Sequence, residues 1–264
     1  MRVCQSRGMA GRRCCLAYLT HKMMRSKIPF NSGNGGLIVS HGSPSDPEPQ
    51  ERFIRRLAER VAARTGLDVR GATLAKDGAL EAAVKGLNAP WVFPHFMTDG
   101  WFVSTNLQNR LKKTGLADWT TLTPLGLSEA LPGLVMRRLQ VALDEYDLPR
   151  GETALIIAAH GSPSNTRPAE VTRDFAQHLH ASGLFSETRV GFVDEDPSIE
   201  EAATVTGPAL LLPFFAARAG HVLMDLPDAV TAAAFAGPVL APIGTWDAIP
   251  LLISEACGGQ RQAI

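Results

Sequence analysis

Two histidines and two carboxylates in the second part of the sequence have the residue types of a metal site. Each follows an apolar run of the kind that forms a buried strand: His160 after 153–159, Asp194 and Glu195 after 188–193, and His221 after 209–215. Two imidazoles and a carboxylate can hold a divalent transition metal and leave coordination positions open. A neutral imidazole also accepts a proton near pH 7. The pattern therefore predicts metal binding coupled to proton transfer.

A simpler interpretation stands beside this one. A single histidine after a strand is more often a turn residue than a ligand, and the segment from Asp194 to Ser198 also resembles a helix N-terminus with Ser198 as its cap. Two histidines at the ends of two strands, one of them inside a repeated motif, keep the metal interpretation open.

The motif around His160 occurs twice in the chain. The segment LIVSHGSPSDPEP, which contains His41, returns as LIIAAHGSPSNTRP around His160, 119 positions later. The motifs around Pro94 and Pro213 are also 119 positions apart, and a third pair of motifs is separated by 118. A nearly constant offset across three separated motifs indicates a duplicated unit.

The two copies differ at the residues that carry the chemistry. Phe102 stands where the second copy has His221, and Ala75 stands where it has Asp194. The first copy therefore keeps His41 but loses the second imidazole and the carboxylate. We expect the metal site in the second copy, with His41 on the opposite wall of a cleft.

Two rival assignments follow from the other histidines. His41 and His95 could form a metal pair in the first copy, although the second copy has Phe214 in place of His95. A histidine-dependent phosphatase rests only on the His-Gly pair. Such enzymes generally need an arginine before that histidine, where this chain has Ser40 and Ala159.

Each copy alternates four short apolar runs with amphipathic stretches. The apolar runs are 36–40, 68–74, 91–96 and 120–125, then 153–159, 188–193, 209–215 and 238–243. The helical stretches between them are 51–64, 79–86, 104–113 and 129–145, then 170–179, 198–203, 221–234 and 246–256. This order is typical of parallel sheets covered by helices on both faces. We predict an α/β protein with two similar doubly wound parallel-sheet halves facing a central cleft.

The chain of 264 residues divides into three predicted parts. Residues 1–34 form an N-terminal extension predicted to be disordered, residues 35–147 form half one, and residues 152–257 form half two with the metal site. The extension has seven basic residues and no acidic one, so the remainder carries 19 basic and 26 acidic residues. That balance argues against nucleic-acid binding.

Other exclusions come from the apolar runs and the cysteines. No run reaches the roughly 18 residues that a membrane-spanning helix needs. The repeat contains one cysteine, Cys257, so a disulfide framework is excluded there and a reducing cytoplasm is expected.

The motifs of half two resemble the class II tetrapyrrole chelatases, specifically the sirohydrochlorin cobalt- and ferrochelatases of the CbiX/SirB type in their long, two-repeat form. Three segments carry the resemblance, which covers residues 36–257: LIIAAHGS, FVDEDPSIEEA and LLPFFAARAGHV. The resemblance implies a lyase that inserts Co²⁺ or Fe²⁺ into sirohydrochlorin for cobalamin or sirohaem, with the metal as substrate and no tightly bound cofactor. The non-catalytic alternative is a carrier of tetrapyrrole or metal with a degenerate first half.

The resemblance also implies roles for individual residues. His160 matches the metal-binding histidine that accepts protons, and His221 matches the second metal histidine. The predicted substrate-binding residues are Asp194, Ala216, Ala217, Arg218, Ala219, Gly220, His41 and Arg167. The chain departs from the family where Asp194 replaces the usual glutamate and where Phe102 breaks the first-half site that many long members keep.

The substrate and the metal set the remaining expectations. Sirohydrochlorin is rich in carboxylates, so Arg167, Arg218 and Lys76 are candidates to bind it, with solvated loop charges as the alternative interpretation. The predicted ligand set accepts cobalt, iron and nickel alike. We expect a monomer or homodimer without nucleic-acid or membrane partners.

Overall fold

The computed structural model describes residues 35–218 and 220–258, except for the side chain of His221. The predicted extension 1–34 lies outside the described residues. Two parallel sheets form the centre of the described chain, one in each half, with strand orders β2-β1-β3-β4 and β6-β5-β7. The strands are β1 Gly36–Ser40, β2 Val69–Thr73, β3 Trp91–Pro94 and β4 Thr120–Thr121, then β5 Ala154–Ala159, β6 Glu187–Phe192 and β7 Ala209–Pro213. The predicted α/β class with two parallel sheets is confirmed.

The first strand of each half lies in the middle of its sheet. β5 pairs with β6 and β7, so that Ala159 lies opposite Phe192 and Ala158 lies opposite Pro213. Every residue of β1, β5 and β7 is buried, because helices cover both faces of a parallel sheet. The residue after β5 is His160, which therefore emerges between the ends of two neighbouring strands.

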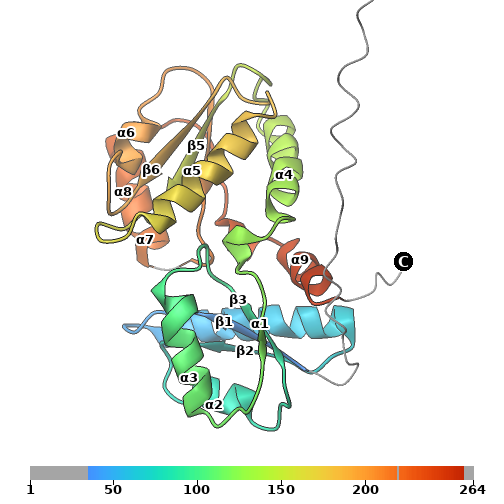
Figure 1. Ribbon diagram of the computed structural model, residues 1–264. Coiled ribbons are helices and arrows are strands. Elements are labelled where there is room, and N and C mark those ends of the chain that lie inside the picture. The colour runs from blue at the N-terminus through green and yellow to red at the C-terminus, as the bar shows by residue number, and fades with distance from the viewer. Residues whose placement is uncertain (1–34, 219, 259–264) are drawn as a thin grey trace, which may run out of the picture. The chain divides into compact units, whose positions relative to one another are not determined.

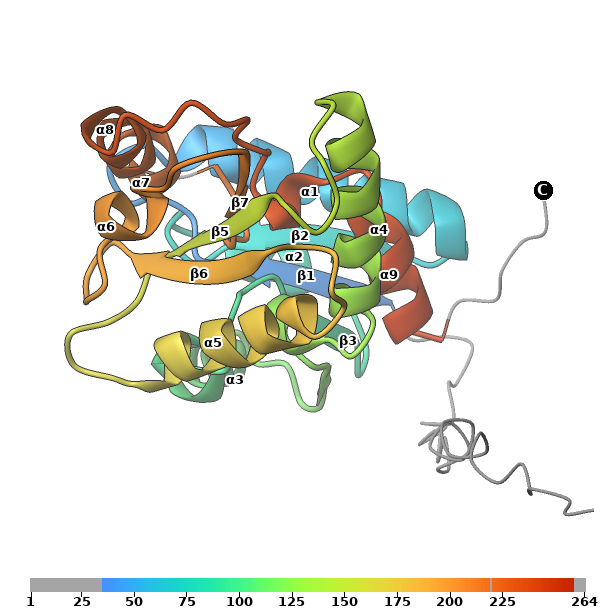
Figure 2. The ribbon, with the colours of Figure 1, turned by 90° about the horizontal axis from the view of Figure 1, so that it is seen from above.

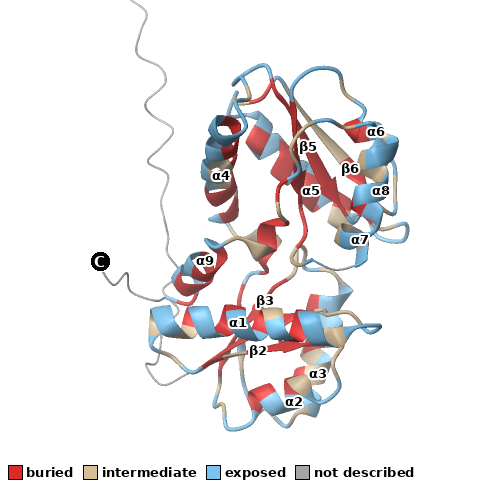
Figure 3. Cartoon of the chain, turned by 180° about the vertical axis from the view of Figure 1, so that it is seen from behind, coloured by how far each residue is buried: buried red, intermediate tan, exposed pale blue. Residues whose placement is uncertain are grey.

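Helices surround both sheets. They are α1 Pro47–Thr65, α2 Ala79–Val84, α3 Gln108–Lys113, α4 Leu131–Glu145, α5 Arg167–His180, α6 Ile199–Ala203, α7 Gly220–Leu223, α8 Asp225–Ala232 and α9 Ile249–Ala256. A π-helical turn, Phe102–Leu107, precedes α3, and two 3₁₀ turns cover Leu125–Leu127 and Ile243–Thr245. Their inward faces are buried with the strands and their outward faces are exposed (Figure 3).

The last helix of each half packs on the other half. α4 contacts α5, and α9 contacts α1; Figures 1 and 2 show α4 beside half two and α9 beside α1. One hydrophobic cluster accordingly includes Ile54 and Leu139 of half one together with Phe175 and Ile253 of half two. The two halves therefore share one hydrophobic core where they contact each other.

Three predicted elements differ from the structure. The run 238–243 forms no strand and contributes one isolated bridge, between Val239 and Leu211, because Pro238 and Pro242 cannot donate the hydrogen bonds of a ladder. The stretch 221–234 divides into α7 and α8, since Pro227 lacks the amide that would continue the helix. The stretch 104–113 begins with the π-helical turn. No helix in the described ranges is long and apolar enough to cross a bilayer.

Candidate functional site

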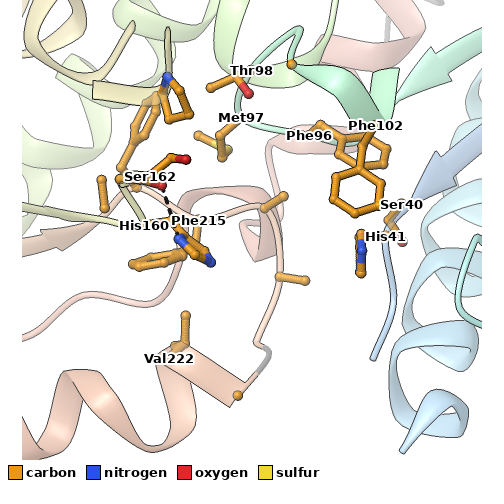
Figure 4. A pocket seen from close by; sticks show the side chains of 18 of the residues that line it. Ser40, His41, Phe96, Met97, Thr98, Phe102, His160, Ser162, Phe215 and Val222 are labelled. Atoms are coloured by element: carbon orange, nitrogen blue, oxygen red, sulfur yellow. Dashed lines mark hydrogen bonds between the residues drawn. The ribbon is translucent and has the colours of Figure 1, made fainter. Parts of the chain in front are cut away.

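A cavity of about 820 Å³ lies where the carboxyl ends of the two sheets face each other. Both His-Gly-Ser motifs line it, with His41 on one wall and His160 on the other (Figure 4). The loops after β3 and β7 also line it, together with residues of α1 and α5. Ligands of open α/β sheets bind beyond the carboxyl ends of the strands, and this volume suits an organic ligand of substantial size.

His160 lines this cavity, and Asp194 contacts it from beside the lining. The Nδ1 atom of His160 lies 3.0 Å from Oδ2 of Asp194 and donates a hydrogen bond to the carbonyl of Gly161 at 3.2 Å. The side chains of His160 and Asp194 are both partly exposed. The backbone supports the pair, because the amide of Asp194 donates to the carbonyl of His160 at 3.0 Å. Carbonyl and carboxylate oxygens can only accept, so both contacts favour the tautomer with the proton on Nδ1 and the lone pair on Nε2. Nε2 is then the atom suited to bind a metal or accept a proton.

Glu195 holds the loop that follows His160. Its carboxylate accepts the amide of Ser162 at 3.0 Å and the guanidinium of Arg173 at 3.3 Å. Gly161, between His160 and Ser162, has φ +72°. A Cβ at this position would lie 2.8 Å from Cγ of Glu195, so the turn requires glycine. Asp194 and Glu195 thus act on the histidine and on its loop respectively.

His221 lies in α7, but its side chain is outside the described part of the structure. Its neighbours Gly220 and Val222 line the same cavity as His160. Ala219 is also outside the described residues. Among the described side chains no group of three or more histidine, cysteine and acidic residues could hold a metal, so the two-histidine site remains a prediction.

The predicted substrate loop borders the cavity through its small residues. Ala216, Ala217 and Gly220 line it, whereas Arg218 is exposed and is not part of the lining. The carbonyl oxygens of Ala216 and Arg218 accept hydrogen bonds from half one, from His95 at 2.8 Å and from Gln50 at 2.9 Å.

His95, the second histidine of the rival metal pair, is buried in half one. It is 1% exposed, and its Nε2 donates to a carbonyl of half two. Burial lowers the pKa of His95 from 6.5 to about 4, against the opposing effect of its backbone hydrogen bonds. Because Nε2 of His95 donates to the carbonyl of Ala216, the structure gives no support to a metal pair of His41 and His95.

Aromatic side chains form the wall opposite His160. The rings of His41 and Phe102 meet edge to face, with centroids 4.3 Å apart, and Trp101 packs on Phe102 at 5.2 Å. Figure 4 shows His41 and Phe102 together, across the cavity from His160 and Phe215. Phe102, which stands in the place of His221 in the repeat, therefore contacts His41 directly.

Two of the three basic candidates are engaged in ion pairs. Arg167 binds Asp99 across the two halves, with Nε 2.9 Å from Oδ1, and this contact lowers the pKa of Asp99 and raises that of Arg167. Lys76 binds Glu48 at 2.7 Å. Arg218 enters none of the ion pairs between described residues.

Comparison with known proteins identifies similar sequences and folds. The CbiX family model matches residues 154–257. The structure of CbiX described as the terminal enzyme for biosynthesis of sirohaem in denitrifying bacteria is 38% identical, with a TM-score of 0.79 over 85% of this chain and 98% of that one. A probable sirohydrochlorin cobaltochelatase from Halobacterium salinarum is 21% identical over an alignment of length 220 that covers 73% of this chain and 75% of that protein.

SirB from Bacillus subtilis shares the fold at lower identity. Its structure with Fe³⁺ is 14% identical, with a TM-score of 0.68 over 84% of this chain and 93% of that one. The structure of the subspecies spizizenii protein in complex with cobalt is also 14% identical, with a TM-score of 0.63 over 85% of this chain and 94% of that one.

Proposed function

The chain belongs to the CbiX/SirB family of sirohydrochlorin cobalto- and ferrochelatases, which are lyases, and we propose that its reaction takes place in the cleft at half two. The metal substrate is Co²⁺ or Fe²⁺, and the product serves cobalamin or sirohaem biosynthesis. The relatives support both metals, because SirB structures contain iron or cobalt and the Halobacterium relative is described as a cobaltochelatase. The observation that carries the proposal is the 3.0 Å contact of Asp194 with His160, which lines the cavity.

The proposed mechanism begins with the cation on imidazole nitrogens. His160 binds it through Nε2, while Asp194 keeps the proton on Nδ1, and His221 supplies a second nitrogen. Insertion replaces two pyrrole N–H protons by the metal, so two protons must leave the macrocycle. As the cation moves to the pyrrole nitrogens, the Nε2 lone pair of His160 is released and accepts one proton. The carboxylate of Asp194 stabilises the imidazolium, and His221 accepts the second proton.

The proposed position of the macrocycle is between the two walls. On one side it contacts the aromatic wall of His41, Phe102 and Trp101, and on the other it contacts the loop that contains Ala216 and Ala217. Small side chains in that loop let a flat ring approach the metal closely. The substrate carboxylates face Arg218 and Arg167. Arg167 releases Asp99 and forms an ion pair with a substrate carboxylate in its place.

An insertion assay on anaerobic sirohydrochlorin tests this proposal. His160→Ala and His221→Ala should each reduce the rate by more than the roughly 10–100-fold that loss of a ligand's hydrogen-bond partner typically costs. The reduction is expected with Co²⁺ and with Fe²⁺, while the melting temperature stays close to that of the wild type. His178→Ala is the matched control, because His178 is exposed on α5, away from the cavity lining. Near-normal insertion by both cavity variants would rule out the assigned residues.

A carrier of tetrapyrrole or metal is the alternative, favoured only by the loss of the second imidazole at Phe102. A carrier binds sirohydrochlorin and metal with saturation but does not accelerate their combination. Insertion is therefore measured with catalytic amounts of protein against the spontaneous rate. More than one turnover per chain excludes a carrier.

A further inference from the structure

Half one holds the substrate loop of half two by two hydrogen bonds. Nε2–H of His95 donates to the carbonyl of Ala216 at 2.8 Å, and Nε2 of Gln50 donates to the carbonyl of Arg218 at 2.9 Å. Both donors are buried, with 1% and 7% exposure, and both border the cavity. We call these two residues and the carbonyls they bind the cross-half clamp.

The loop is also shaped from within half two. The amide of Gly244 donates to the carbonyl of Phe215 at 3.0 Å. A Cβ at Gly244 would lie 2.0 Å from the carbonyl oxygen of Ala216, so any larger residue there would displace the carbonyl that His95 binds. His95 is packed against the ring of Phe53, with centroids 5.8 Å apart. The carbonyl and its donor are therefore both confined.

The repeat shows that the clamp acts in one direction only. At the offset of 119, half two has Phe214 in the place of His95 and Ala169 in the place of Gln50. Neither side chain has a polar donor, so half two cannot return the same bonds to half one. The half that has lost two of the predicted metal-site residues is thus the half that keeps the donors.

We propose that His95 and Gln50 are positioning residues for metal insertion. They fix the backbone from Ala216 to Arg218, and this backbone leads directly into α7, which begins at Gly220 and contains His221. The inference rests on the proposed function for the role of His221. It explains what half one contributes to a reaction whose proposed metal ligands lie in half two.

The variants that test the clamp copy the residues of the other half. His95→Phe reproduces Phe214, and Gln50→Ala reproduces Ala169. His95→Gln restores an amide donor near the former Nε2. Gln108→Ala is the matched control for Gln50→Ala, because Gln108 also donates Nε2 to a backbone carbonyl, that of Val103, but within half one.

Hydrogen–deuterium exchange of peptides covering 214–224 measures the clamp without any chelation. We expect faster exchange there in His95→Phe and Gln50→Ala, faster still in the double variant, partial restoration in His95→Gln, and no change in Gln108→Ala. If His95→Phe does not fold, Gln50→Ala carries the test. Unchanged exchange in Gln50→Ala would overturn the proposal.

Insertion kinetics then connect the clamp to the reaction. We expect kcat/KM for Co²⁺ to fall about tenfold in each single variant, with recovery in His95→Gln and wild-type values in Gln108→Ala. Faster exchange with unchanged kinetics would also overturn the positioning role. A wild-type chain that does not chelate but shows the exchange pattern contradicts the proposed function and leaves the clamp intact, so the two failures are distinct.

Discussion

At the scale of single residues, the site depends on how Asp194 holds His160. A carboxylate bound to one imidazole nitrogen orients the ring and raises the basicity of the other nitrogen, and loss of such a partner typically costs 10–100-fold in metal affinity or activity. The observed 3.0 Å contact with Nδ1 makes Asp194 a direct partner of the proposed proton acceptor.

Asp194→Asn is therefore expected to lower kcat/KM for insertion by about 10–100-fold, because a neutral amide stabilises the imidazolium less than a carboxylate does. Asp194→Glu restores a carboxylate with one more methylene and should retain more activity than Asp194→Asn. Steady-state insertion rates check both, with Asp196→Asn on the same loop as the control. Equal activity of wild type and Asp194→Asn would contradict the assigned role.

The buried ring of His95 predicts a pH dependence of stability. Its folded pKa of about 4 lies below the ordinary 6.5, so the folded state binds the proton more weakly than the unfolded state does. The stabilising contribution is complete above pH 6.5 and is lost as the pH falls toward 4, by up to about 3 kcal/mol. Melting temperatures between pH 7.5 and 4.5 should therefore fall more steeply in the wild type than in His95→Gln. A His178→Ala control should follow the wild type, and parallel curves for all three would refute this contribution.

Sequence reasoning identifies His160 and Asp194 because residues at the ends of adjacent strands converge. It does not identify His95 as a loop donor, because its acceptor lies 121 positions away in the other half. The repeat held a signal for this role: a histidine and a glutamine in half one are matched by phenylalanine and alanine in half two. A donor kept in one copy and lost in the other indicates an interaction that is not reciprocal.

At the scale of elements, the central position of the first strand brings the predicted residues together. The apolar runs predicted seven of the strands. The signal is plainest for β1, β5 and β7, which are buried along their whole length. The eighth prediction was wrong because the run 238–243 contains Pro238 and Pro242. Apolar composition alone does not form a ladder when the amides at both ends are missing.

Arg167, in the first turn of α5, forms an ion pair with Asp99 in the loop after β3. This ion pair leads to a prediction about the affinity for the substrate. If Arg167 exchanges Asp99 for a substrate carboxylate, Asp99→Asn should lower the KM for sirohydrochlorin a few-fold, by about 0.2–1 kcal/mol of released ion pairing. Arg167→Ala should raise that KM. Asp68→Asn, which breaks a similar exposed pair with Arg70, is the control. A rise in KM in Asp99→Asn would show that the pair itself, and not the released arginine, supports binding.

At the scale of the whole molecule, the duplication has produced two interdependent halves that differ in their histidines and carboxylates. α4 and α9 each pack on the opposite half, and the inner cores merge into one cluster. The repeat in the sequence indicated two similar units, but this exchange of terminal helices depends on the path of the chain in space and leaves no local pattern. The exchange holds the two walls of the cavity together.

Because half one has Phe102 in the place of His221, a final prediction concerns His41. Its ring packs against Phe102, so we expect it to contact the macrocycle and not the metal. His41→Ala should raise the dissociation constant for sirohydrochlorin, followed by absorbance, about three- to tenfold, in the range of a lost aromatic contact. It should leave Co²⁺ affinity, measured by titration without tetrapyrrole, unchanged, whereas His160→Ala should abolish Co²⁺ binding. If His41→Ala removes Co²⁺ binding and His160→Ala does not, the metal belongs to half one and the roles of the two walls are reversed.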